Sequence, residues 1–410
     1  MINNRKALAG IRIVDFSWAG IGPLTARHLA HHGAEVVKVE STTRPDVMRL
    51  LRPAKDGFLG EDLDRSGWLA QFNTNKYGIT LNMKHPKALG VMKKLLSVTD
   101  VVLDNFSSGV MEKWGLGYDE VSKLKADIIM ISLSMMGQTG RFNNFRGRGY
   151  HLAAMVGISD ITGWPDRNPV GHSRAYTDFL VPHFGAIAVL AALAYRLKTG
   201  KGQYIDLAQR EAALFSVGPS ILEFTTNGKY ITRAGNRLHY QLAAPHNVYK
   251  CAGEERWCAI SVFNDQEWNS LCQVMGNPDW CKKPEFSTLL DRDRNRDQLD
   301  QNIEEWTSKL PAEKVMTLLQ EAGIPAGVVN NPKDMLNDPQ LKARNHFWEL
   351  DHKVLGKHYC QGPGFKLSKT PAELTMPAPL IGEHNDYIYT KLVALSDEEF
   401  AELVVSGTFE

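Results

Sequence analysis

The stretch LAGIRIVDFSWAGIGPLTARHLAHHGAEVVKVES, residues 8–41, decides the fold class. Its apolar run at 11–16 predicts a strand, the apolar spacing at 23–32 predicts a helix, and residues 35–40 predict a second strand. Two parallel strands need a crossover connection, and a helix supplies it. The segment is therefore a βαβ unit, which indicates a parallel sheet.

The same alternation continues along the first half of the chain. Strand patterns recur at 78–83, 100–106 and 127–134, and helical patterns at 85–98 and 118–126 separate them. Because regular alternation of strands and helices is typical of α/β proteins, we expect a doubly wound, Rossmann-like parallel sheet over roughly the first 200 residues.

A change in composition indicates a second domain. Residues 225–249 are rich in turn formers, and a strand pattern with charged helices follows them. We expect a large α/β domain at 1–227 and a smaller α+β domain at 228–335. The Pro-rich segment at 336–410 is expected to be extended and to return to the large domain.

Charge and cysteine content exclude several classes of protein. The 410 residues include 47 Lys and Arg against 46 Asp and Glu, a net charge of +1, so no overall basic field exists to hold nucleic acid or a membrane surface. The five cysteines form no CxxC pair, which predicts reduced thiols and no zinc site or other metal. The N-terminus lacks a signal-peptide pattern, and the charge-free run Phe184–Tyr195 is shorter than the roughly 20 residues that span a bilayer. We expect a cytoplasmic protein.

The first turn, Gly20-Ile21-Gly22-Pro23-Leu24-Thr25, imitates a dinucleotide-binding fingerprint. Glu40 ends the second strand, where a ribose-binding acid would stand. Thr25 replaces the third glycine, however, and that glycine normally permits close helix–strand packing. An NAD-dependent dehydrogenase is therefore one alternative, and a tight βα turn with Pro23 at the first helical position is the other.

Other catalytic motifs are missing or ambiguous. The chain has no HExxH and no GxSxG, so the sequence indicates neither a zinc hydrolase nor a serine nucleophile on an elbow. The run RFNNFRGRGY at 141–150 carries three arginines, which fit either a solvated loop or a site for a phosphate-rich ligand.

Asp178 precedes a long apolar helix that the pattern RLKTG ends at Gly200. Since Pro182 is tolerated in a first turn, we expect this helix to begin near Leu180 or Val181. Asp178 would then be its N-cap, or a carboxylate kept ionised and exposed as a nucleophile by the positive end of the helix.

Eight segments in order resemble the family III CoA-transferases, also called the CaiB/BaiF type, which include carnitine CoA-transferase and formyl-CoA transferase. The similarity extends along nearly the whole chain. The segments are the opening stretch and then FNTNKYGITLNMK, DNFSSGVMEKWGLGYDEV, SLSMMGQTGR, RLKTGKGQYIDL, AAPHNVYKC, GIPAGVVN and LIGEHN.

The resemblance implies that Asp178 is the catalytic nucleophile. It would attack a donor thioester, form an acyl-aspartyl anhydride and then an aspartyl-CoA thioester, and pass CoA to an acceptor acid. The family pattern implies that Gln138, with backbone N–H groups of a glycine-rich stretch, stabilises the oxyanions. Coenzyme A enters as a thioester substrate, and no permanently bound cofactor is implied.

The resemblance also implies a set of CoA contacts. Lys113 stands where relatives often carry Arg, and Ser41 where an arginine can stack on adenine, so Arg44 is expected to substitute. Gly20 replaces a substrate-binding Gln of the formyl-CoA transferases. The implied CoA-binding positions are Ala19, Ile21, Arg44, Leu81, Lys84, Asn105, Phe106 and Lys113.

Alternatives within the same resemblance stay open. Related α-methylacyl-CoA racemases carry Gly-His-Asp where this chain has Gly149-Tyr150-His151, and a non-catalytic subunit of a two-chain transferase is a third possibility. Succinyl-CoA:(R)-benzylsuccinate CoA-transferase subunits are similar in their motifs, which suggests a succinyl-CoA donor and an aryl- or alkyl-substituted succinate acceptor. Family members form interlocked dimers, so a homodimer or a heterodimer with a paralogous subunit is expected.

Overall fold

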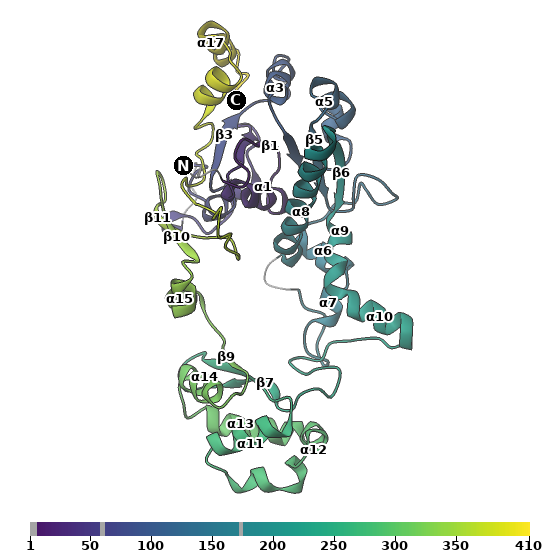
Figure 1. Cartoon of the computed structure of the whole chain (residues 1–410), viewed down its shortest axis with the longest axis vertical. Coiled ribbons are helices and arrows are strands. Elements are labelled where there is room, and N and C mark those ends of the chain that lie inside the picture. Colours follow the sequence, from purple (N-terminus) through teal and green to yellow (C-terminus); the bar gives the residue numbers. More distant parts are fainter. Residues whose placement is uncertain (1–5, 58–61, 172–174) are drawn as a thin grey trace. The chain divides into compact units, whose positions relative to one another are not determined.

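Two compact units make up the chain, as the ribbon in Figure 1 shows. The computed structural model describes residues 6–57, 62–171 and 175–410. Unit 1 comprises the chain up to 157, with 171–219 and 339–410, and unit 2 comprises 158–170 and 220–338. The main breaks therefore fall at 219/220 and 338/339, where the sequence predicted 227/228 and 335/336.

A six-stranded parallel sheet forms the centre of unit 1, in the order β3-β2-β1-β4-β5-β6. The strands are β1 (Arg12–Asp15), β2 (Glu35–Glu40), β3 (Lys76–Thr80), β4 (Val101–Asp104), β5 (Ile129–Ser134) and β6 (Gln203–Ala208). This is the strand order of a doubly wound Rossmann-like fold, so the predicted fold class is confirmed. The order reverses between β1 and β4, and ligands of such folds bind outside the carboxyl ends of the strands at that point.

Helices connect these strands and cover the sheet (Figure 1). Residues of β1 to β5 are largely buried on both faces because both faces are covered, as parallel sheets require. The helices of unit 1 are α1 (Ile21–His31), α2 (Gly67–Phe72), α3 (Ala88–Leu96), α4 (Val110–Lys113), α5 (Tyr118–Leu124), α6 (Gly149–Met155), α8 (Tyr176–Thr199), α9 (Gln209–Leu214), α16 (Pro339–Ala343) and α17 (Asp397–Val405).

The helix α8 begins earlier than the sequence predicts. Its first residue is Tyr176, and Pro182 lies inside the helix, so the expected start near Leu180 was wrong. A proline there removes the hydrogen bond to the carbonyl of residue 178, a loss that packing of a long helix can offset. The end is as predicted, since Gly200 takes the left-handed conformation with φ 73°.

Close packing of α8 on α1 explains why the first turn is not a dinucleotide fingerprint. A Cβ added at Gly185 of α8 would lie 2.7 Å from Oγ1 of Thr25, so Thr25 fills the place where the two helices meet. In the described part of the chain, α8 alone has the length and composition to cross a membrane, and seven of its residues are buried.

The C-terminal segment packs on unit 1. It forms a hairpin of β10 (Phe347–His352) and β11 (Gly356–Gln361), and the π-helix Tyr387–Leu392 follows. The buried Tyr389 donates a hydrogen bond of 2.8 Å to the carbonyl of Thr80 at the end of β3. The same tyrosine belongs to the core that contains Val14 of β1 and Val37 and Val39 of β2.

Unit 2 is a small α+β structure with its own core. Its antiparallel sheet has the order β7-β8-β9, formed by His246–Lys250, Trp257–Ser261 and Ala326–Val328. The helices of this unit are α7 (Ile158–Ile161), α11 (Asp265–Val274), α12 (Leu289–Arg294), α13 (Arg296–Thr307), α14 (Ala312–Glu321) and α15 (Pro332–Asn337), and α10 (Gly218–Asn227) spans the break at 219/220. Residues 158–170 join this unit through non-local contacts that periodicity does not show, such as Gly235 N–H to the carbonyl of Gly163 at 2.8 Å.

Candidate active site

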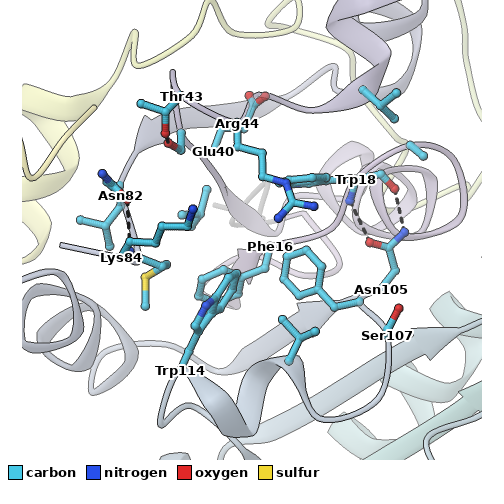
Figure 2. Close-up of a pocket in the computed structure, with 18 residues that line it drawn as sticks. Phe16, Trp18, Glu40, Thr43, Arg44, Asn82, Lys84, Asn105, Ser107 and Trp114 are labelled. Atoms are coloured by element: carbon cyan, nitrogen blue, oxygen red, sulfur yellow. Dashed lines mark hydrogen bonds between the residues drawn. The ribbon is translucent and has the colours of Figure 1, made fainter. Parts of the chain in front are cut away.

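A pocket of about 590 Å³ opens at the reversal of strand order in unit 1, and we call it the switch-point pocket (Figure 2). Its walls come from the segments that follow β1, β2, β3 and β4. The lining residues are Phe16, Trp18, Ala19, Val39, Glu40, Ser41, Thr43, Arg44, Val47, Leu81, Asn82, Met83, Lys84, Asn105, Phe106, Ser107, Val110 and Trp114.

The turn between β1 and α1 is held rigidly at this pocket. Trp18 N–H donates to Oδ1 of Asn105 at 2.9 Å, and Asn105 Nδ2 returns a hydrogen bond to the Trp18 carbonyl at 2.7 Å (Figure 2). Ala19 takes a left-handed φ of 60°, and its N–H donates to Oδ1 of Asp46 at 3.0 Å. Strain of this kind persists only where surrounding contacts fix the backbone, and it marks functional sites.

Buried charged side chains hold the turn between β1 and α1 in place. Nζ of Lys38 lies 2.9 Å from both the Ser17 carbonyl and Oδ2 of Asp46, and both charged side chains are fully buried. Burial opposes the charged amine, but the carboxylates of Asp46 and its neighbours keep the pKa of Lys38 above its ordinary value. Glu40 is bound by Arg49, and although burial raises its pKa, that guanidinium holds the pKa at about 2. The acidic lining of the pocket is thus neutralised.

The pocket combines aromatic walls with two exposed cations. The Trp18 and Phe106 rings meet edge to face at 5.8 Å between centroids, and Phe106 meets Trp114 at 5.1 Å. The guanidinium of Arg44 lies 5.2 Å from the Trp18 ring, and Lys84 lines the opposite wall (Figure 2). Such a site suits a ligand with a flat ring and anionic groups.

Six of the eight predicted CoA-binding residues line this pocket, namely Ala19, Arg44, Leu81, Lys84, Asn105 and Phe106. Ile21 is instead buried as the first residue of α1, and Lys113 is exposed at the end of α4. The sequence reasoning missed Phe16 and Trp114, although Trp114 stands directly after Lys113 in the third motif.

Asp178 lies in the first turn of α8 in unit 1. The N-cap is Ala175, so the interpretation of Asp178 as N-cap was wrong. Its Oδ1 accepts a hydrogen bond of 2.5 Å from Nε2 of Gln209, the first residue of α9. Burial raises the pKa of the Asp178 carboxyl above its ordinary value, and the hydrogen bond from Gln209 opposes that rise.

Two glycines lie against the Asp178 carboxylate, where a side chain would come into close contact with it. A Cβ added at Gly20 would lie 3.2 Å from Oδ2 of Asp178, and one at Gly149 would lie 3.1 Å from Oδ1. Gly20 directly follows Ala19, which lines the switch-point pocket. We call Asp178, Gln209, Gly20 and Gly149 the Asp178 centre. The turn after β1 therefore runs from the pocket to Oδ2.

The remaining predicted residues lie on neighbouring segments. Nε2 of Gln138 lies 3.5 Å from the Phe106 carbonyl, and its backbone N–H donates to Oδ1 of Asp206 at 2.9 Å. His151 of α6 accepts from the N–H of Arg148 at 3.2 Å, so its ring caps that helix. The basic run at 141–148 is largely exposed.

Comparison with known proteins identifies the family. The model of CoA-transferase family III matches residues 8–385. The chain belongs to this family. It is 33% identical over 398 residues to succinyl-CoA–D-citramalate CoA-transferase of Chloroflexus aurantiacus, with 97% of each chain covered. The succinyl-CoA–L-malate CoA-transferase beta subunit of the same organism is 31% identical, over 97% of this chain and 96% of the relative.

A solved structure agrees with this assignment to family III. A CaiB/BaiF family protein from Brucella suis superimposes with a TM-score of 0.86 at 27% identity, over 95% of this chain and 100% of that one. The resemblance inferred from the motifs is therefore confirmed, and the protein is an enzyme of the CoA-transferase type. The NAD-dependent dehydrogenase interpretation of the first turn was wrong.

Proposed function

We propose that this enzyme transfers CoA from succinyl-CoA to a second carboxylic acid, with Asp178 as the nucleophile. The observation that carries the proposal is the position of Asp178 in a family III chain. It is a partly buried carboxylate, next to the glycine that continues the pocket wall, and its side chain does not cap its helix. Burial raises the pKa of the Asp178 carboxyl, and a more basic carboxylate is a stronger nucleophile.

The proposed reaction exchanges one carboxylate for another without water. An oxygen of Asp178 attacks the thioester carbon and the C–S bond breaks. CoA departs as the thiolate, and an acyl-aspartyl anhydride is formed. The thiolate then attacks the aspartyl carbon, which expels the donor acid and forms aspartyl-CoA. The acceptor carboxylate repeats the sequence in reverse, which yields the new acyl-CoA and restores Asp178.

Residues of the switch-point pocket would bind CoA in this scheme. The aromatic wall of Trp18 and Phe106 would pack against the adenine, while Arg44 and Lys84 would bind phosphates. In the family pattern Gln138 stabilises an oxyanion, and its place beside the Phe106 carbonyl puts it near the same pocket.

The acceptor is a substituted succinate such as (R)-benzylsuccinate in our proposal. Two relatives are named for succinyl-CoA as donor and for D-citramalate or L-malate, which are substituted dicarboxylic acids. Next to Asp178 the ring of Phe179 is 38% exposed and meets Phe72 edge to face at 6.0 Å. An aryl or alkyl substituent would find apolar surface there, and Gly20 offers no polar side chain.

A panel of CoA thioesters and free acids tests this function. Purified enzyme is incubated with each pair, and exchanged acyl-CoA is measured by mass spectrometry. We expect succinyl-CoA with aryl- or alkyl-substituted succinates to exceed oxalate or carnitine as acceptors. Equal or faster turnover with oxalate or carnitine would overturn the acceptor assignment.

We also propose that the enzyme works as a cytoplasmic dimer, either of two copies or of this chain with a paralogous subunit. Apolar residues of unit 1 are strongly exposed, including Ile187 at 63%, Leu197 at 88% and Phe215 at 76%. A partner would cover this surface. Light scattering of the protein expressed alone should give the dimer mass if the partner is a second copy, and a monomer mass would indicate a different subunit or none.

A further inference from the structure

Gln209 is a buried side chain that the motif comparison did not single out. It follows β6 directly and opens α9, and it is 6% exposed. Its Nε2 donates to Oδ1 of Asp178 at 2.5 Å and to Oγ1 of Thr177 at 3.2 Å. Both hydrogen bonds of the amide nitrogen are therefore made, and they fix the amide against one oxygen of the carboxylate.

The two oxygens of Asp178 thus have different surroundings. Oδ1 faces Gln209 and Gly149, while Oδ2 faces Gly20 at the end of the turn that lines the switch-point pocket. Because Gly20 follows the pocket-lining Ala19, a thioester bound in that pocket would approach the carboxylate from the Oδ2 side. A lone pair on Oδ2 is also freer to attack, because the amide of Gln209 occupies Oδ1.

We propose that Oδ2 of Asp178 is the attacking oxygen and that Gln209 is the oxyanion donor for every step in which the aspartyl carbon is attacked. This inference rests on the function proposed above. Once Oδ2 bridges to the acyl group, Oδ1 is the carbonyl oxygen on the aspartyl side of the anhydride. When CoA thiolate attacks that carbon, a C–S bond forms and the carbonyl electron pair moves to Oδ1.

The negative charge then lies on the atom that Gln209 already contacts. Collapse of this intermediate re-forms the carbonyl at Oδ1 and breaks the bond between the aspartyl carbon and Oδ2. The donor acid leaves as a carboxylate that carries Oδ2, and the thiolate sulfur stays on the aspartyl carbon as the aspartyl-CoA thioester. A donor set in advance at the position of the developing charge accelerates such a step, and loss of one donor typically lowers kcat on the order of 10²–10³-fold.

The geometry assigns Gln209 to the attack on the aspartyl carbon and not to the attack on the donor thioester. In the first step charge develops on the thioester oxygen, which Gln209 does not contact in this scheme. Removal of the amide should therefore leave anhydride formation possible but slow its capture by thiolate. Water would then consume more of the anhydride, so hydrolysis of acyl-CoA should increase relative to transfer.

The test compares Gln209→Leu, which removes the donor, with Gln203→Leu on β6 as a matched control. We expect Gln209→Leu to lower kcat for transfer on the order of 10²–10³-fold, with KM for acyl-CoA nearly unchanged and a higher ratio of hydrolysis to transfer. Gln203→Leu should resemble wild type. Transfer near the wild-type rate, or an equal fall of transfer and hydrolysis, would overturn the inference.

A second variant keeps the test decisive if Gln209→Leu does not fold. Gln209→Glu preserves the shape, and its carboxyl group donates a hydrogen bond to Oδ1 only when protonated. Its transfer rate should therefore increase as the pH is lowered from neutral, relative to wild type. A rate that stays low and shows no such recovery would contradict the role of Gln209.

Asp178→Ala, assayed in parallel, separates this inference from the proposed function. If Asp178→Ala still transfers CoA near the wild-type rate, the nucleophile assignment itself fails. If Asp178→Ala is inactive while Gln209→Leu is active, only the inference about Gln209 fails.

Discussion

The switch-point pocket and the Asp178 centre are built in different ways. The pocket takes its residues from 16 to 114, on the turns that follow four neighbouring strands. The Asp178 centre joins residues 20, 149, 178 and 209, which lie at the starts of four helices far apart in the sequence. The turns after neighbouring parallel strands lie together at the point where the strand order reverses, so the switch-point pocket follows from the sheet topology. The Asp178 centre depends instead on how the helices pack.

The largest effect is expected from substitutions of Asp178, which test the chemistry of the Asp178 centre. Asp178→Ala and Asp178→Asn should each lower CoA transfer by about 10⁴-fold or more, because no anhydride can form. Thermal unfolding should change little, since the Asp178 side chain does not cap α8 and burial disfavours its charged form. The same variants should form no CoA adduct on the peptide that contains residue 178. Adduct formation in either variant would move the nucleophile elsewhere.

Gly20→Val tests whether the two regions meet at Gly20. A Cβ there would lie 3.0 Å from Cβ of Asp178, so a larger side chain must displace the nucleophile. We expect kcat to fall on the order of 10²-fold, as misplacement of a reacting group by about 1 Å does, with a smaller change in KM. Gly90→Val on α3 is the control, because a Cβ there meets nothing within 4 Å. An unchanged kcat would show that a side chain at residue 20 does not displace Asp178.

The comparison also shows what could be predicted from the sequence. The βαβ pattern of 8–41 predicts the parallel sheet, and the motifs after the strands predict most of the pocket residues. Both predictions rest on short stretches of sequence. Resemblance points to Asp178, but the preference of proline for a first turn places the helix start too late, because α8 begins at Tyr176 and accommodates Pro182 inside it. Gln209 carries no motif of its own, and only the packing of α9 beside α8 reveals its contact with Asp178.

Lys84→Ala tests the pocket, and a smaller effect is expected. The side chain lies on the pocket wall and should act in binding alone, so KM for acyl-CoA should increase by about tenfold while kcat stays nearly constant, as loss of uniform binding does. Lys123→Ala on the surface of α5 removes the same charge away from the pocket and should leave both values unchanged. A fall in kcat at normal KM would instead assign Lys84 to the chemistry.

The smallest effect is a shift in pH dependence. Asp178 must be ionised to attack, so kcat/KM should fall as the pH drops through its pKa. Burial places that pKa above the ordinary value of 3.8, and the hydrogen bond from Gln209 lowers it. The acid limb should therefore lie above pH 3.8 in the wild type and move to higher pH in Gln209→Leu, because the interaction that favours the ionised form is gone. A pH–rate profile of the wild type and one of the residual activity of Gln209→Leu measure the two acid limbs. An acid limb that stays in place in Gln209→Leu would mean that the amide does not act on Asp178 in solution, and the two halves of the Asp178 centre would then be neighbours without coupling.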